Sequence, residues 1–159
     1  MKTAFKDYSI RDWEPRDRQA AAEAIATVLA EYGLAWDPEG VDRDALAVEA
    51  CYLETGGAFW VVERGDRIVG TGGYYPIQRG VRAVEIRKMY LLPVARGQGL
   101  GRFLLQQLEA AIAADRYCQI WIETVSVLTE AVRLYEQNGY TLVKDVETPR
   151  CDLAYVKML

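Results

Sequence analysis

The chain has 159 residues, 51% of them hydrophobic and 26% charged, a composition typical of one globular domain and not of a disordered chain. Its net charge of −4 argues against nucleic acid as a partner, because such binding neutralises phosphates with clustered basic side chains. No apolar run approaches the roughly 18 residues that span a bilayer, and the segment Met1–Asp7 lacks the apolar core of a signal peptide. We therefore expect a single domain over residues 1–159, located in the cytoplasm, with no nucleic-acid or membrane partner.

The first third of the chain predicts a strand followed by two helices. Phe5–Arg11 alternates apolar and polar residues, as a half-buried strand does. Ala20–Leu29 is rich in alanine and predicts a helix, which Gly33 ends. A second helix is expected from Asp42, which can cap its first turn, to about Cys51.

The middle of the chain predicts three consecutive strands. Ala58–Glu63 and Arg67–Tyr75 are rich in strand-forming residues, and Gly65-Asp66 between them is a tight-hairpin signal. A loop over Pro76–Val81 leads to a further strand at Val84–Leu92.

The last third of the chain predicts helices alternating with strands. A helix begins near Leu100, and its apolar residues recur at a spacing of four, which gives one stripe facing a sheet. The other elements expected are a strand at Gln119–Thr124, a helix at Thr129–Gln137 that ends at Asn138-Gly139, and closing strands at Tyr140–Val143 and Leu153–Val156. This order predicts a mixed α/β sheet with helices on its faces.

The absence of histidine limits the chemistry available to the chain. It excludes Ser-His-Asp and Cys-His catalysis and every metal site that contains histidine. Cys51, Cys118 and Cys151 are far apart and not in metal-ligand spacing, so we expect no metal. Any general base must then be Glu, Asp, Tyr, Cys, Lys, a terminal amine or water.

The most informative motif is Arg96-Gly97-Gln98-Gly99-Leu100-Gly101, which lies between a predicted strand and a predicted helix. Glycines allow the backbone to approach a ligand closely, and the first N–H groups of a helix lack intrahelical partners. The motif therefore predicts a bound phosphate or pyrophosphate. A Walker loop would need Lys-Ser/Thr, and the third glycine of a dinucleotide fingerprint would fall on Arg102, so both nucleotide interpretations fit poorly.

The pattern Arg96-x-x-Gly99-x-Gly101 resembles the acyl-CoA-binding motif of the GNAT N-acetyltransferase superfamily. Met89–Pro93 resembles the strand that leads into that motif, and Ala131–Tyr140 resembles the family's second motif, so that the resemblance covers roughly residues 84–143. It implies a GNAT-like α/β (α+β) fold, with a mostly antiparallel mixed sheet of about six to seven strands and about four helices. It also implies acetyl-CoA as co-substrate, no metal, and acetyl transfer to a primary amine of a small molecule, an amino acid or a peptide. Homodimers are common in this family.

The resemblance also implies a set of co-substrate contacts. The pyrophosphate would lie on the N–H groups of Gln98 to Arg102, with charge added by the arginines at both ends of the loop. The pantetheine arm would pair with the backbone of Met89 to Leu91, where one N–H stabilises the oxyanion. The expected cofactor-binding residues are Met89, Tyr90, Leu91, Arg96, Gly97, Gln98, Gly99, Leu100, Gly101, Arg102 and Thr124.

The catalytic candidates that the resemblance implies are Glu85 and Tyr135. Glu85 is expected to act as the general base through a water, because it lies roughly 13 Å along the strand from Met89 unless a bulge intervenes. An ion pair with Arg87 is the alternative role for Glu85. Tyr135 is expected to return a proton to the leaving thiolate, and a core tyrosine is the alternative. Glu123 and Tyr90 are reserve candidates.

The acceptor pocket is expected between the first two helices and the loop at Pro76–Val81. The candidates to line it are Tyr32, Trp36, Tyr74 and Tyr75, with Arg79 and Arg82 for an acceptor carboxylate. Fold does not fix function, so a non-catalytic acyl-CoA-binding or sensing module remains the alternative to an enzyme.

Overall fold

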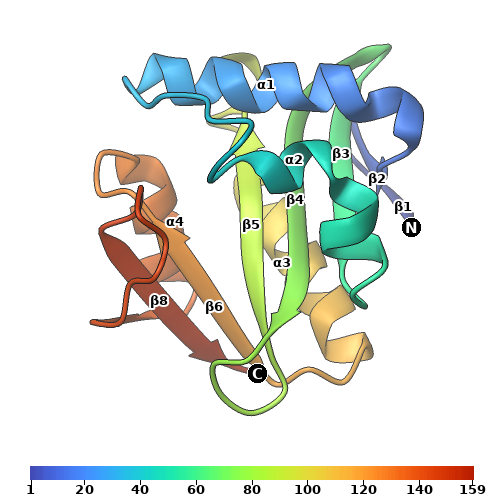
Figure 1. Ribbon diagram of the computed structural model, residues 1–159. Helices are drawn as coiled ribbons and strands as arrows, with labels where there is room; N and C mark the ends of the chain where they lie inside the picture. Colours follow the sequence, from blue (N-terminus) through green and yellow to red (C-terminus); the bar gives the residue numbers. More distant parts are fainter.

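The computed structural model describes residues 1–159. Its strands are β1 (Lys2–Phe5), β2 (Tyr8–Asp12), β3 (Ala58–Arg64), β4 (Arg67–Ile77), β5 (Ala83–Leu91), β6 (Gln119–Thr124), β7 (Thr141–Val143) and β8 (Leu153–Met158). Its α-helices are α1 (Arg18–Glu31), α2 (Arg43–Leu46), α3 (Leu100–Ala114) and α4 (Thr129–Gln137), and short turns of other helix types are η1 (Pro15–Asp17), η2 (Glu49–Leu53) and η3 (Pro93–Ala95). The strands form one 8-stranded sheet in the order β1-β2-β3-β4-β5-β6-β8-β7 (Figure 1).

All neighbouring strands of the sheet are antiparallel except β5 and β6. These two parallel strands pair only at Ala83–Glu85 and Gln119–Trp121. Beyond this point they diverge (Figure 1), and the rest of β6 pairs with β8 alone. The edge of β5 that faces β6 is therefore unpaired over residues 86–91.

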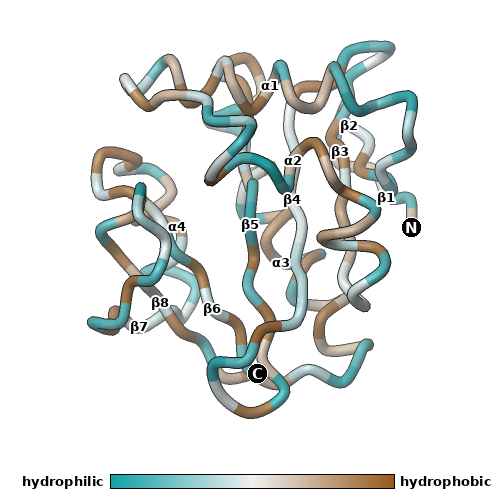
Figure 2. Tube along the Cα trace, in the orientation of Figure 1, coloured by the Kyte–Doolittle hydropathy of each residue, from teal (hydrophilic) through white to brown (hydrophobic).

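The helices cover both faces of the sheet, with α1 and α2 on one face and α3 on the other (Figure 1). The predicted stripe of α3 is confirmed, because Leu100, Leu104, Leu108 and Ile112 are all buried in the larger core cluster. A smaller core lies under α1 and the two short helices that follow it. Figure 2 shows a hydrophilic stretch in the upper part of β5, whereas the lower part of the strand is more hydrophobic. No helix of the structure has the length and apolar character needed to cross a bilayer.

A β-bulge interrupts the pairing of β4 with β5. Thr71 pairs with Tyr90 but Gly73 pairs with Arg87, so β5 carries an extra residue opposite Gly72. Lys88 lies in the bulge at a φ of 53°, which is rare for a residue with a side chain. The Thr71 hydroxyl donates a buried hydrogen bond of 2.6 Å to the Lys88 carbonyl and holds this backbone in place.

Several element predictions were wrong in detail. The strand expected at Phe5–Arg11 is a hairpin of β1 and β2 that turns at Lys6, whose φ is 52°. This extra strand gives the sheet eight strands, one more than the six to seven expected. The helix expected from Asp42 to Cys51 is broken into α2 and η2, and the Asp42 side chain caps neither. Pro76 lies in β4 and not in a loop. It is in the part of β4 that pairs with β5 but no longer with β3.

Candidate functional site

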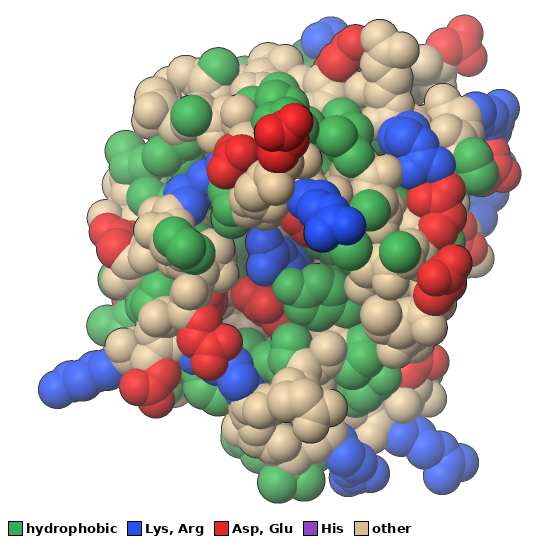
Figure 3. Space-filling model, viewed as in Figure 1, with side chains coloured by type: hydrophobic (Ala, Val, Ile, Leu, Met, Phe, Trp, Pro, Cys, Tyr) green, Lys and Arg blue, Asp and Glu red, His purple; other side chains and the backbone are tan.

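A cavity of about 260 Å³ lies where β5 and β6 diverge, and we call it the inner cavity. It is lined by the free edge of β5, the end of β6, the N-terminus of α3, and α4. It adjoins an outer cavity lined by the segment between α1 and α2, the end of β4, and residues 147–150 of the loop between β7 and β8. Figure 3 shows a hollow on this face of the molecule, with basic and acidic side chains inside it.

The loop before α3 carries free backbone donors and lies beside the inner cavity. The Arg96 N–H bonds to Pro93 and the Phe103 N–H bonds to Gly99, but no N–H from Gly97 to Arg102 donates to a protein acceptor. Gly97 and Gly99 adopt φ values of 76° and 85°, in the left-handed region that favours glycine. A run of free donors at the N-terminus of a long helix is suited to bind an anion, as the motif predicts.

The side chains of the predicted loop residues make different contacts. The Arg96 guanidinium donates to both carboxylate oxygens of Glu31, at 2.6 and 2.8 Å, and to the Leu91 carbonyl at 2.9 Å. It therefore fastens the end of β5 to α1, while Arg102 is exposed, lines the cavity and has no ion-pair partner. The Gln98 side chain donates to the hydroxyl of Tyr8, away from the cavity.

Leu100 is buried in the core, so its side chain is not available to a ligand. Gly97 and Gly101 line the inner cavity, whereas Gln98, Gly99 and Leu100 do not line it. The predicted strand residues Met89, Tyr90 and Leu91 all line it from the unpaired edge of β5. The structure thus brings the glycine loop and this edge together at one cavity.

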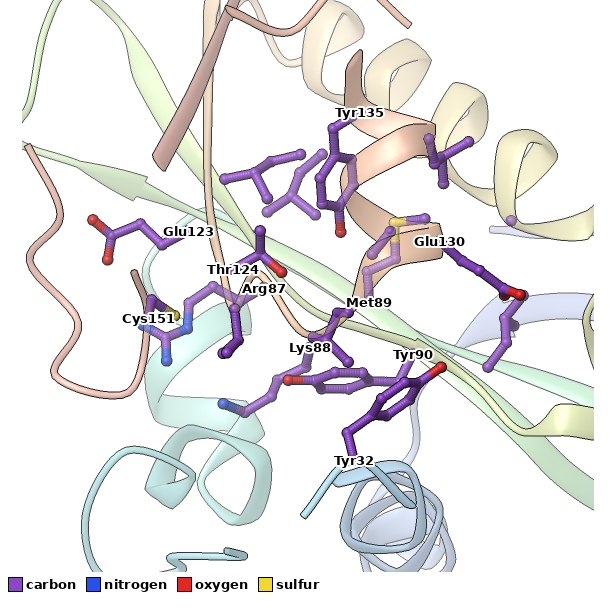
Figure 4. Close-up of a pocket in the computed structure, with 18 of the residues that line it drawn as sticks. Tyr32, Arg87, Lys88, Met89, Tyr90, Glu123, Thr124, Glu130, Tyr135 and Cys151 are labelled. Carbon is purple, nitrogen blue, oxygen red and sulfur yellow. The ribbon is translucent and has the colours of Figure 1, made fainter. Parts of the chain in front are cut away.

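Thr124 and Tyr135 also line the inner cavity. Figure 4 shows the Tyr135 ring extending from α4 into the cavity, with its hydroxyl between Thr124 and Met89. Tyr135 is 4% exposed and its hydroxyl has no hydrogen-bond partner within the protein. Burial raises the pKa of Tyr135 far above its ordinary value, so its phenol stays protonated at neutral pH.

Glu85 lies at the last residue of β5 that pairs with β6, and it lines both cavities. Its side chain is buried, and its carboxylate is 3.8 Å from the Arg87 guanidinium. Burial raises the pKa of Glu85, and the negative charge of Glu123 raises it further, against the opposing effect of Arg87. A carboxyl group with a raised pKa in a cleft is suited to accept a proton near neutral pH.

The acceptor-side candidates are only partly brought together. Tyr75 and Arg79 line the outer cavity, and Tyr32 lines the inner one. Arg79 donates to Glu123 at 2.9 Å, so its charge is already paired. The remaining candidates line neither cavity: Tyr74 is buried and donates to Asp115, Trp36 packs against the smaller core, and Arg82 is exposed.

A cluster of buried charges around Asp42 was not predicted. The fully buried Asp42 carboxylate accepts hydrogen bonds from Arg150, at 2.9 and 2.5 Å, and from the Asp37 N–H at 2.8 Å. The Lys88 ammonium lies 3.1 Å from Asp42 and 3.2 Å from Asp44. Burial alone would raise the pKa of Asp42, but these donors outweigh it and lower the pKa. The one sequence signal was the charged pair at 87–88 inside an apolar strand.

The sequence of this chain is similar to those of known acetyltransferases. The model of the acetyltransferase (GNAT) family matches residues 10–140. The chain is 35% identical over 128 residues to YjgM, an uncharacterized N-acetyltransferase of Escherichia coli (strain K12), covering 79% of this chain and 77% of that protein. It is 29% identical to N-acetyltransferase 8B of Rattus norvegicus over 61% of this chain, but it spans only 46% of that relative.

Solved structures share the fold. A GNAT-family acetyltransferase from Staphylococcus aureus Mu50 has a TM-score of 0.87 at 20% identity, over 95% of this chain and 98% of that chain. A Salmonella typhimurium acetyltransferase, solved with its cofactor acetyl-CoA, has a TM-score of 0.72 at 21% identity, over 96% of this chain and 93% of that chain. Because the family match runs through both the glycine loop and the helix that carries Tyr135, this chain belongs to the acetyltransferase (GNAT) family.

Proposed function

We propose that the protein transfers the acetyl group of acetyl-CoA to a primary amine of a small molecule, an amino acid or a peptide. The observation that carries this proposal is the run of free N–H groups from Gly97 to Arg102 beside the unpaired edge of β5. A pyrophosphate fits the first feature and a pantetheine amide chain fits the second. The acetyl-CoA complex of the Salmonella typhimurium relative supports the choice of co-substrate.

The binding contacts follow from this placement. The pyrophosphate accepts hydrogen bonds from the loop N–H groups, and Arg102, which has no partner, adds charge. Arg96 acts through its position instead, because its guanidinium already holds Glu31 and the Leu91 carbonyl. The pantetheine arm lies along residues 89–91 and within reach of the Thr124 hydroxyl, which lines the same cavity.

The chemistry is a direct attack of the amine on the thioester. The nitrogen forms a bond to the acetyl carbon while the carbon–sulfur bond breaks, and an N–H on the β5 edge stabilises the negative charge that develops on oxygen. Glu85 accepts the amine proton through a water, and the Tyr135 phenol gives a proton to the departing thiolate. Both groups line the inner cavity, Glu85 from β5 and Tyr135 from α4.

Replacing Tyr135 with Phe is expected to lower kcat about 10- to 100-fold while the KM for acetyl-CoA changes little, because the variant loses only the proton donor. The ring fills the same space in the core, and the lost hydroxyl has no partner within the protein, so stability should be unchanged. Steady-state kinetics at saturating amine measure both constants. An unchanged kcat would remove Tyr135 as the acid.

Replacing Gly99 with Ala is expected to raise the KM for acetyl-CoA about tenfold with little change in kcat. A side chain at a φ of 85° strains the backbone by about 1–2 kcal/mol and shifts the N–H groups that hold the pyrophosphate. Gly139→Ala is the matched control, since Gly139 has a φ of 89° and lies at the other end of α4 from the cavity. It should lose similar stability in chemical unfolding but keep the KM. Equal KM changes in the two variants would contradict a specific role for the loop.

The proposal as a whole is tested by two measurements on the purified protein. Binding of acetyl-CoA is measured by calorimetry, and release of free thiol is measured against a panel of amino acids, polyamines, aminoglycosides and short peptides. Tight binding with thiol release on at least one amine supports the enzyme. Binding with no turnover on any amine would indicate a sensing module instead.

A further inference from the structure

The inner and outer cavities meet at a shared wall. The residues that line both are Val41, Glu85, Arg87, Glu123, Thr148 and Arg150. Under the proposed function, on which this inference rests, the acetyl group lies in the inner cavity. An acceptor in the outer cavity must therefore pass these residues, and we call their position the junction.

Arg150 crosses the cleft at the junction. It lies in the loop between β7 and β8, and its guanidinium binds both carboxylate oxygens of Asp42 and donates to the Ala35 carbonyl at 2.7 Å. Asp42 and Ala35 belong to the segment between α1 and α2, on the opposite wall. The bridge therefore joins two segments that would otherwise stand as separate walls of an open groove.

The bridge is anchored at both of its ends. Asp42 is fully buried and is also held by Lys88 and by the Asp37 N–H. On the other side, the Glu123 carboxylate accepts hydrogen bonds of 2.7 Å from the N–H groups of Glu147 and Thr148. Opening the bridge would leave a buried charge with fewer partners, so the closed form is the stable one.

We propose that the Arg150–Asp42 bridge closes the junction into a ring, which admits a small amine at the end of an unbranched chain and excludes the N-terminal α-amine of a polypeptide. An open groove accommodates a chain that continues on both sides of the reacting group. A substrate can enter a closed ring only with its amine end first. The branched α-carbon of a peptide N-terminus is wider than a CH₂–NH₂ group, so it does not pass.

The first test measures selectivity as a ratio of kcat/KM values. The two probes are 1,4-diaminobutane and the α-amine of trialanine, with thiol release as the readout. The ratio should favour the diamine at least about tenfold in the wild type, and should fall about tenfold in Arg150→Ala through faster reaction of the peptide. Arg18→Ala is the matched control, because Arg18 binds both carboxylate oxygens of Glu49 as Arg150 binds those of Asp42 but lines neither cavity, so the ratio should persist. A ratio that is the same in Arg150→Ala as in the wild type overturns the proposal.

The second test does not depend on turnover. Cys151 lines the inner cavity next to the bridge, whereas Cys118 lines neither cavity and serves as the internal reference. We expect iodoacetamide to alkylate Cys151 while a polyethylene-glycol maleimide does not, and we expect this size discrimination to fall at least about tenfold in Arg150→Ala, mapped by mass spectrometry. Arg150→Lys, which keeps the charge but not the two-point contact, serves if Arg150→Ala does not fold.

The two tests separate the inference from the proposed function. Suppose that the size discrimination at Cys151 depends on Arg150 but no amine is turned over. The ring then exists and the proposed function fails. Normal turnover with no such discrimination means that the enzyme is correct and the ring is absent.

Discussion

Glu85→Gln protein is expected to have a kcat/KM about 100- to 10,000-fold below that of the wild type, the range by which general bases accelerate reactions. The amide keeps the size of the side chain but accepts no proton from the amine. The wild-type kcat/KM should fall as the pH drops through the raised pKa of Glu85, because only the carboxylate acts as a base. This fall in kcat/KM should occur at a pH above the ordinary glutamate pKa of about 4.3, and it should be absent from the variant. A pH profile of thiol release at fixed acetyl-CoA measures it.

Stability provides the control for this result. A carboxyl group whose pKa is raised in the folded state binds its proton more tightly when folded, so its charged form at neutral pH lowers the stability. The neutral amide in Glu85→Gln should therefore leave the free energy of unfolding unchanged or slightly higher. Wild-type activity in the variant would show that Glu85 only pairs with Arg87, 3.8 Å away, and would leave Glu123 as the next candidate for the base.

Replacing Asp42 with Asn is expected to lower the free energy of unfolding by about 3–5 kcal/mol, the largest stability loss that we expect from a single substitution. It leaves the buried Lys88 ammonium and the Arg150 guanidinium without their shared carboxylate. Urea unfolding at neutral pH measures the loss. The control is Asp12→Asn, which removes the ion pair between Asp12, 58% exposed, and the N-terminal amine, and should cost at most about 1 kcal/mol. Equal losses in the two variants would show that the Asp42 cluster adds no more stability than a surface pair.

The pH dependence of the Asp42 contribution has a definite sign. The pKa of Asp42 is lowered in the folded protein, so the folded state prefers the carboxylate. The stabilisation is complete above the unfolded pKa of about 3.9 and is lost as the pH falls through the lower, folded value. Acid unfolding of the wild type should therefore include this loss, whereas the Asn variant should show a smaller decrease over the same range.

Features set by local sequence were predictable in this chain, and features set by distant partners were not. The apolar stripe of α3 and the start of this helix directly after the glycine loop depend on spacing within a few residues, and both predictions are confirmed. The turn of the first hairpin was missed because Lys6 adopts a positive φ without being glycine or asparagine. The pairing of Asp42 with Arg150 joins residues 108 positions apart, so no local pattern could indicate it. Asp42 looked like a helix cap for the same reason, because an unpaired aspartate before a helix usually caps it.

The divergence of β5 and β6 divides the molecule into a part that ends with α3 and a part made of β6, α4, β7 and β8. Strand pairing between β5 and β6, which joins these parts, is limited to Ala83–Glu85 with Gln119–Trp121. Under the proposed function, the pantetheine arm fills the gap as a strand would and adds hydrogen bonds that the ladder lacks. Acetyl-CoA is then a structural element as well as a substrate, and each cycle of binding and release tightens and loosens the joint between the two parts.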